Sequence, residues 1–446
     1  MLPLRVITLG CSKNSVDTEH LLFQVKDSYE ILPEDDPRDA HTVIVNTCGF
    51  IGDAKEESIN VILEQAQLKA DGRIQRLLVM GCLSQRYPSE LRKLIPEVDG
   101  WFGARDLAPV VRALGCEPDK ASAYMRTSAT KRLPYAFLKI SEGCDRRCSY
   151  CAIPLIRGRH RSVPMATLVK EAEQLAAEGV KELVVIAQDS TWYGLDLYKR
   201  RALAELLHKL SEVQGIEWIR IHYSYPDSFP EDVLDEMASN PKICRYLDIP
   251  LQHVADPVLS AMHRSVDGAK TRALVRKMRE KVPGVVLRTT MMVGHPGEGR
   301  KEFNELLRFL DEARFERLGA FAYSEEEGTW GAENLKDSVT RRTKLGRLQR
   351  LMQHQREISL AFNQSRVGSV VRVLVDDAVD ATLVCRSEYE SPEVDGEILV
   401  KWPGADAQRL IGRFIDVKIT AAYEYDLEGV PCGKIIEAIC TKKLFR

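Results

Sequence analysis

The chain has 446 residues, of which 44% are hydrophobic, and its formal net charge at pH 7 is −2. This length predicts several domains, and a charge so close to zero excludes a general electrostatic attraction to nucleic acid. No apolar run approaches the roughly 18 residues of a membrane span, and the start lacks a signal-peptide layout. The odd count of eleven cysteines argues against a disulfide framework. We therefore expect a cytoplasmic protein without a membrane partner.

Residues 1–115 alternate short apolar runs with helical runs, which predicts a small doubly wound α/β domain. The expected strands are Leu4–Leu9, Thr42–Asn46 and Arg76–Met80, and the expected helices are Ser15–Val25 (with Ser15 as its cap), Ala54–Ala70 and Ser84–Leu94. A cysteine next to a glycine follows each expected strand: Cys11, Cys48 and Cys82. The carboxyl ends of parallel strands share one edge, so these thiols should converge, and glycine permits close backbone approach there. We favour a cluster with three protein ligands over core thiols or a zinc site.

Residues 116–134 have turn composition and are expected to be a linker. Residues 135–335 repeat strand, loop and helix six times, which predicts a partial barrel with active-site loops beyond the carboxyl ends of its strands. The expected strands are Phe137–Ser141, Glu182–Ala187, Trp218–Tyr223, Tyr246–Ile249, Val285–Val293 and Leu318–Tyr323.

The loop after the first of these strands carries Cys144, Cys148 and Cys151 at CxxxCxxC spacing. Three thiolates on one tight loop suit an iron–sulfur cluster or zinc. Zinc would need a fourth ligand, for which His160 is the candidate. Nearby arginines form either a solvated basic face or a docking strip for an acidic partner: Arg146, Arg147, Arg157, Arg159 and Arg161.

A linker helix, Val339–Asn363, is expected within residues 336–366. Residues 367–446 then show short alternating strands that predict a five-stranded antiparallel barrel: Val370–Val375, Ala381–Cys385, Gly396–Val400, Phe414–Ala421 and Leu427–Val430. From Arg366 onward 14 acidic residues face 11 basic ones, which fits a basic protein partner better than nucleic acid. The residues expected to attract that partner are Asp376, Asp377, Asp380, Glu388, Glu390 and Glu393.

Several stretches together resemble the methylthiotransferases of the radical S-adenosylmethionine (SAM) superfamily over essentially the whole chain. They are Leu9–Glu19, Ser141–Cys148, Ala152–Gly158, Trp218–Pro226, and Arg386-Ser387 with Pro392–Gly396. Within that family the likeness is nearest to members that modify ribosomal protein S12, and the last domain corresponds to a TRAM domain. One departure is His295, which stands where an aromatic residue is usual before Pro-Gly-Glu.

The resemblance implies two 4Fe–4S clusters, one on Cys144, Cys148 and Cys151, and one on Cys11, Cys48 and Cys82 that holds the sulfur. It implies methylthiolation of the β-carbon of an aspartate in ribosomal protein S12, free or within its ribosomal subunit, with methyl from SAM and an electron from a reducing donor. The expected SAM contacts are Tyr150, Gln188 and Asp189 and, on the ribose and adenine side, Gln252, His253, Gly294 and Glu298. A methylthiotransferase acting on a tRNA adenosine and a non-catalytic iron–sulfur redox sensor stay as alternatives, although direct tRNA binding is not expected.

Overall fold

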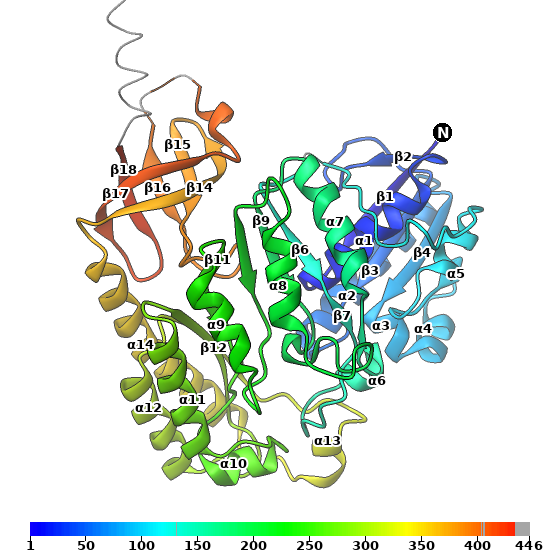
Figure 1. Cartoon of the computed structure of the whole chain (residues 1–446). Helices are drawn as coiled ribbons and strands as arrows, with labels where there is room; N and C mark the ends of the chain where they lie inside the picture. Colours follow the sequence, from blue (N-terminus) through cyan, green and yellow to red (C-terminus); the bar gives the residue numbers. More distant parts are fainter. Residues whose placement is uncertain (131, 403, 405, 433–446) are drawn as a thin grey trace, which may run out of the picture.

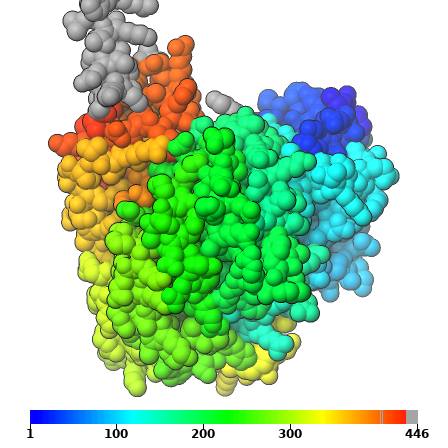
Figure 2. Space-filling view, in the orientation of Figure 1, coloured from blue at the N-terminus to red at the C-terminus, as the bar shows by residue number. Residues whose placement is uncertain are grey.

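The computed structural model describes residues 1–130, 132–402, 404 and 406–432. Two parallel sheets and a small closed barrel follow one another along the chain (Figure 1). On the face seen in Figure 2 the central part lies between the N-terminal and C-terminal parts. The predicted three-part fold is confirmed. The portion of the predicted last domain after Cys432 lies outside the described residues.

The N-terminal sheet is parallel throughout, with the strand order β2-β1-β3-β4-β5. Its strands are β1 (Leu2–Thr8), β2 (Tyr29–Leu32), β3 (Thr42–Thr47), β4 (Arg76–Gly81) and β5 (Gly100–Trp101). Its helices are α1 (Ser12–Val25), α2 (Gly52–Ala70), α3 (Cys82–Arg86), α4 (Pro88–Leu94) and α5 (Ala108–Ala113). The short strands β2 and β5 at the two edges were not predicted.

Two details of the predicted helices were wrong. Helix α1 begins at Ser12 with Cys11 at its N-cap, so Ser15 lies inside the helix and caps nothing. The helix predicted over Ser84–Leu94 is two helices that meet at Tyr87. Pro88 starts the second of them, since a proline has no N–H to continue the first helix.

The central sheet has six parallel strands in the order β13-β12-β11-β10-β9-β6, as the partial barrel requires. They are β6 (Tyr135–Lys139), β9 (Glu182–Ile186), β10 (Trp218–Ile221), β11 (Ile243–Asp248), β12 (Val286–Val293) and β13 (Arg317–Ala322). Strand β9 is buried along its whole length, which explains its apolar run from Leu183 to Ile186.

Helices flank this sheet, and several of them pack against it in the main apolar core. They are α6 (Ile153–Arg157), α7 (Met165–Ala177), α8 (Leu203–Ser211), α9 (Glu231–Ser239), α10 (Asp256–Ala261), α11 (Gly268–Lys281), α12 (Arg300–Ala313) and α13 (Trp330–Asn334). A two-stranded ribbon, β7 (Ser141–Glu142) with β8 (Arg161–Ser162), frames the CxxxCxxC loop.

The long helix α14 (Arg341–Ser365) leads into the closed C-terminal barrel. The barrel strands are β14 (Val370–Val379), β15 (Thr382–Arg386), β16 (Ile398–Lys401), β17 (Phe414–Ala422) and β18 (Leu427–Cys432). Its pairings are antiparallel except between β16 and β18, which pair in parallel and close the barrel.

Helix α1 packs against the central sheet as well as its own. Val16 belongs to an apolar cluster with Phe137, Val184 and Ile186 of β6 and β9. The N-terminal domain therefore lies against the strands whose loops were predicted to form the active site. Among the described residues, no helix is both long enough and apolar enough to cross a membrane.

Candidate functional site

The three N-terminal cysteines lie at neighbouring strand ends. Cys11 caps α1 just after β1, Cys48 directly follows β3, and Cys82 directly follows β4. These strands are adjacent in the sheet, and Thr47 pairs with Gly81, one residue before Cys48 and Cys82 respectively. The predicted convergence of the three positions is confirmed, while their role as cluster ligands stays a prediction.

The glycines beside these cysteines fit the space that the thiols need. A Cβ added to Gly10 would lie 2.7 Å from the Cys48 Cβ and 3.0 Å from its Sγ. A Cβ added to Gly81 would lie 2.6 Å from the Thr47 carbonyl oxygen. Both glycines have positive φ, +93° and +106°, so a side chain would be strained as well as crowded.

Burial keeps the inner thiols protonated when no metal is present. It raises the pKa of the Cys82 thiol to about 11, although the Arg157 guanidinium opposes the shift. Burial also raises the pKa of Cys48, with Cys11 adding to the effect. A metal bound here would have to displace these protons, as thiolate ligation generally does.

The CxxxCxxC loop runs between β7 and α6 and is fastened at both ends. The Cys144 N–H donates to the Gly158 carbonyl (3.0 Å), and the Cys151 N–H donates to the Cys148 carbonyl (3.1 Å). Ser149 is anchored to α10, since its Oγ donates to the Ala261 carbonyl at 2.7 Å. Burial raises the pKa of Cys144 to about 12.

Two arginines and two aromatic rings pack beside this loop. The Arg146 guanidinium lies 4.3 Å from the centre of the Trp192 ring and 3.8 Å from that of Tyr225. Arg264 lies 4.1 Å from the same Tyr225 ring, and its Nη1 is 3.8 Å from the Cys148 Sγ. The loop therefore has a buried cation next to one of its thiols.

The loop residues predicted to contact SAM divide into two groups. Three of the predicted contacts present a buried atom without a hydrogen-bond partner in the described chain, namely Gln188 Oε1, Gln252 Oε1 and His253 Nε2, and the neighbouring His295 Nε2 is a fourth such atom. They come from the loops that follow β9, β11 and β12. Because buried polar atoms are normally paired, these four fit a polar ligand that this edge of the sheet would hold.

Asp189 and Glu298 already have hydrogen-bond partners within the chain, and their role as SAM contacts stays a prediction. Asp189 accepts from Arg146 Nε at 2.8 Å and, through its other oxygen, from the Thr191 N–H and hydroxyl. Glu298 accepts from the Gly294 N–H at 2.6 Å and pairs with Arg347 at 2.8 Å. Both carboxylates therefore stabilise loops of the site.

The ring of His295 packs as an aromatic residue would. It lies edge-on to Tyr323, with ring centres 4.9 Å apart, and edge-on to Tyr150 at 6.3 Å. Burial lowers the pKa of His295 to about 4, so the ring is neutral at pH 7. This packing is compatible with a histidine at the position where the resemblance led us to expect an aromatic side chain.

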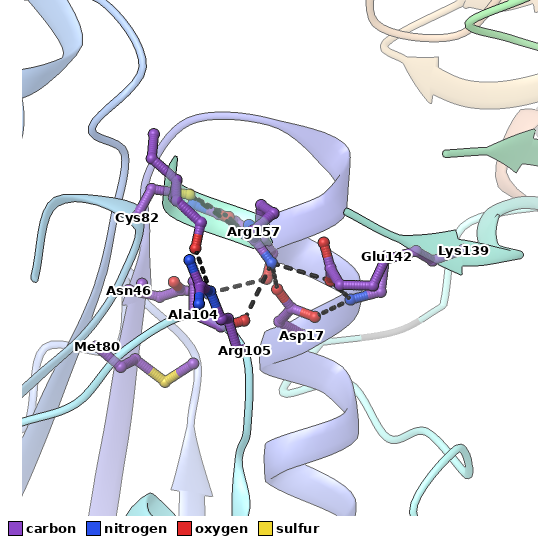
Figure 3. A network of polar contacts seen from close by, with 12 residues as sticks. Asp17, Asn46, Met80, Cys82, Ala104, Arg105, Lys139, Glu142 and Arg157 are labelled. Carbon is purple, nitrogen blue, oxygen red and sulfur yellow. Dashed lines mark hydrogen bonds and ion pairs between the residues drawn. The ribbon is translucent and has the colours of Figure 1, made fainter. Parts of the chain in front are cut away.

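A buried ionic network joins Cys82 of the N-terminal set to Glu142, which directly precedes the CxxxCxxC loop segment (Figure 3). Asp17 of α1 accepts from Lys139 of β6 and from Arg157 of α6, the latter at 2.7 Å. Glu142, two residues before Cys144, also accepts from Lys139 (2.8 Å) and Arg157 (3.1 Å). The arginine was expected on an exposed basic rim, but its side chain is only 2% exposed.

A zinc centre that uses His160 is not supported. His160 Nε2 lies 3.1 Å from the Ser162 hydroxyl and 3.7 Å from Asp196, and it contacts no cysteine. In the part of the chain that the structure describes, no three His, Cys, Asp or Glu side chains are grouped so that they could hold a metal ion. The assignment of six cysteine ligands therefore stays a prediction based on their placement.

Three of the six acidic residues predicted to attract a basic partner have partners within the chain, and the docking role of all six stays a prediction. Glu390 is buried between Arg317 (2.8 Å) and Arg366. Asp376 pairs with Arg386 (2.9 Å), and Glu388 accepts from the Arg245 N–H (3.1 Å). The contacts of Glu390 with Arg317 and of Glu388 with Arg245 hold the C-terminal barrel on the central sheet, whereas the Asp376–Arg386 pair lies within the barrel. Asp377, Asp380 and Glu393 are exposed.

The chain is similar to known proteins over nearly its whole length. Residues 4–103 match the Uncharacterized protein family UPF0004, residues 138–310 the Radical SAM superfamily, and residues 367–432 the TRAM domain. The chain is 48% identical over 424 residues to ribosomal protein uS12 methylthiotransferase RimO of Phocaeicola vulgatus, covering 95% of this chain and 97% of the relative. It is 50% identical to the protein of the same name from Porphyromonas gingivalis, with the same coverage.

Among solved structures, the fold is similar to that of TsrM, a radical S-adenosylmethionine methyltransferase from Kitasatospora setae. The TM-score is 0.54 at 16% identity, and the match covers 72% of each chain. At this identity the likeness concerns the fold alone.

Proposed function

The chain belongs to the ribosomal protein uS12 methylthiotransferase family of radical SAM enzymes, and on that basis we propose that it adds a methylthio group to the β-carbon of an aspartate in that ribosomal protein. One observation supports the proposal: a buried ionic network runs across the contact between the first two domains, from Cys82 to Glu142, two residues before Cys144. A reaction that joins a sulfur donor to a radical centre needs two sites next to one another.

The target bond explains why two sites are needed. An aspartate β-carbon holds its hydrogen in an unactivated C–H bond, and no general base in a protein removes such a hydrogen as a proton. An iron–sulfur cluster and SAM supply the radical chemistry when bound. Cys144, Cys148 and Cys151 would hold that cluster, and Cys11, Cys48 and Cys82 would hold a second one that carries the sulfur.

The other residues of the site bind and orient. Gln188, Gln252 and His253 present buried polar atoms without partners and are the SAM contacts of this proposal. Tyr150 packs in the apolar cluster beside them, and its ring closes the site on the side of Tyr323. Glu298 accepts a hydrogen bond from the Gly294 N–H and so stabilises the loop that contains Gly294.

Several parts of the proposal concern partners. A reducing electron donor is required, and the reaction takes place in the cytoplasm. Of the six acidic residues predicted to attract the basic substrate, Asp377, Asp380 and Glu393 are exposed and are the docking residues of this proposal. A tRNA adenosine is the second candidate substrate, but the acidic excess of that barrel disfavours it.

Mass spectrometry of ribosomal protein uS12 after anaerobic reaction tests this function. The reconstituted enzyme with SAM and dithionite should add one methylthio group to an aspartate. The Cys82→Ala enzyme should still cleave SAM but leave the ribosomal protein unmodified. A methylthio group found on tRNA instead, with uS12 unchanged, would contradict the proposal.

A further inference from the structure

Arg157 is the residue that contacts both halves of the candidate site. It ends α6, six residues after Cys151, and thus belongs to the segment that follows the CxxxCxxC loop. Its Nη2 lies 3.3 Å from the Cys82 Sγ and donates to the Asn14 Oδ1 at 2.5 Å. Its Nη1 donates to Asp17, Glu142 and the Ala104 carbonyl. Every acceptor but Glu142 belongs to the N-terminal domain.

The surroundings of Arg157 explain how a buried cation is tolerated there. Lys139 and Arg157 carry two positive charges, and Asp17 and Glu142 carry two negative ones, all four within one hydrogen-bonded group (Figure 3). The group is neutral overall, so burying it avoids the cost of an uncompensated charge. The planar guanidinium can reach a sulfur while it stays paired with both carboxylates, which a lysine ammonium could not do as well.

Asn14 connects Arg157 to the backbone that precedes Cys11 and Cys48. Its Nδ2 donates to the carbonyl oxygens of Leu9 (2.7 Å) and Thr47 (3.1 Å), the residues that lead to Gly10-Cys11 and to Cys48. Its Oδ1 accepts from Arg157. Arg157 thus contacts one N-terminal cysteine directly and the chain leading to the other two through a single asparagine.

We propose that Arg157 is a positioning residue that orders the N-terminal cysteine set against the CxxxCxxC loop and raises the reduction potential of the cluster on that set. This inference rests on the proposed second cluster. A donor with a positive charge at a ligand sulfur stabilises the more negative, reduced cluster, and outer-shell hydrogen bonds of this kind are known to tune metal centres. The potential of the sulfur-carrying cluster is therefore set by a residue from the radical SAM domain.

The test measures the potential of the N-terminal cluster alone. Full-length chains in which Cys144, Cys148 and Cys151 are alanine are reconstituted anaerobically, iron is counted, and the cluster is titrated by electron paramagnetic resonance. Arg157→Gln keeps a donor but removes the charge. We expect the equilibrium constant for reduction to fall about tenfold, which is about 59 mV for a one-electron couple.

Arg105→Gln is the matched control. Arg105 crosses the same domain contact and donates to the carbonyl oxygens of Leu155 (2.6 Å) and Ile156 (2.9 Å) of α6, but it contacts no cysteine. Its substitution should leave the potential unchanged. An equal shift in both variants would mean that a looser domain contact, and not the Arg157 charge, moves the potential, and it would overturn the proposal.

The remaining outcomes separate this inference from the proposed function. Arg157→Gln leaves a net negative charge in the network. If this single variant does not fold, the double variant Asp17→Asn/Arg157→Gln, in which the network is neutral again, is measured in its place. Iron bound with an unchanged potential would overturn the role of Arg157 only. No iron in the parent chain that retains Arg157 would overturn the second cluster as well.

Discussion

At the scale of single residues, Gly81 is the position near the N-terminal cysteines that tolerates a side chain least. Its φ of +106° is open to glycine, and an added Cβ would meet the Thr47 backbone at 2.6 Å and 2.7 Å. Because Cys82 comes next in the chain, any shift that relieves this clash moves a predicted cluster ligand. Backbone geometry at one glycine therefore decides whether the three thiols can share a cluster.

Gly81→Ala should lower the iron bound at the N-terminal site to a small fraction and destabilise the chain by about 1–3 kcal/mol. Iron analysis in the chain without Cys144, Cys148 and Cys151, together with thermal unfolding, measures both effects. Gly72→Ala is the control, since Gly72 also has a positive φ (+78°) but no atom within 4 Å of an added Cβ. It should cost some stability and keep its iron, and equal iron loss in both variants would contradict this explanation.

The sequence predicted the cysteines better than the polar residues around them. Cys11, Cys48 and Cys82 follow strands, and strand ends in a parallel sheet converge by geometry alone. Asp189 lies in a loop and Arg157 at the end of a short helix, where a polar side chain is equally compatible with binding a ligand and stabilising a neighbour. Their partners, Arg146 and Asp17, are 43 and 140 residues away in sequence, and no local pattern predicts such pairs.

At the scale of elements, the loop after β13 is held on the N-terminal domain by Glu326. Its carboxylate pairs with Lys55 of α2 and with Arg86 of α3, both at 2.9 Å, and its side chain is 5% exposed. The same loop leads to α13, whose Gly331 N–H donates to the Ser149 carbonyl in the CxxxCxxC loop. The segment 324–331 thus joins the N-terminal domain to the cysteine loop by a second route.

Glu326→Gln should loosen this segment, since removing one member of a buried ion pair costs about 3–5 kcal/mol. Limited proteolysis should then cut between Ser324 and Trp330 at least tenfold faster than in the unsubstituted chain. Glu325→Gln alters an exposed neighbour in the same loop and should leave the cleavage rate unchanged. Cleavage rates that match in all three chains would show that the ion pairs do not hold the loop.

At the scale of the whole molecule, buried ion pairs fasten the C-terminal barrel to the central sheet. Glu182 of β9 lies between Arg220 and Arg386, each at 2.7 Å, and Glu390 lies between Arg317 and Arg366. A smaller apolar contact accompanies them, in which Trp218 and Phe414 meet at 4.8 Å between ring centres. The five strands of the barrel could be predicted from alternation, but its docking could not, because the charges that dock it looked like a surface patch in the sequence.

These pairs make the attachment sensitive to acid. Burial alone would raise the pKa of Glu390, but Arg366 and Arg317 outweigh it and hold the pKa well below its ordinary value. In the unfolded chain the same carboxyl takes up a proton near pH 4.3. The stability from Glu390 is therefore complete above that pH and is lost as the pH falls towards the lower pKa of the folded chain.

Urea unfolding followed between pH 7 and pH 3 checks that the stability contributed by Glu390 is lost in acid. The free energy of unfolding should fall as the pH drops below about 4.3, and Glu390→Gln should make this pH dependence less steep. The same substitution should lower the free energy of unfolding at pH 7 by about 3–5 kcal/mol, because Arg317 and Arg366 lose their buried partner. Asp377→Asn, at an exposed site on the same barrel, should keep the slope of the unsubstituted chain. A Glu390→Gln chain that is as stable at pH 7 as the unsubstituted one would mean that the apolar contact around Trp218 alone holds the barrel in place.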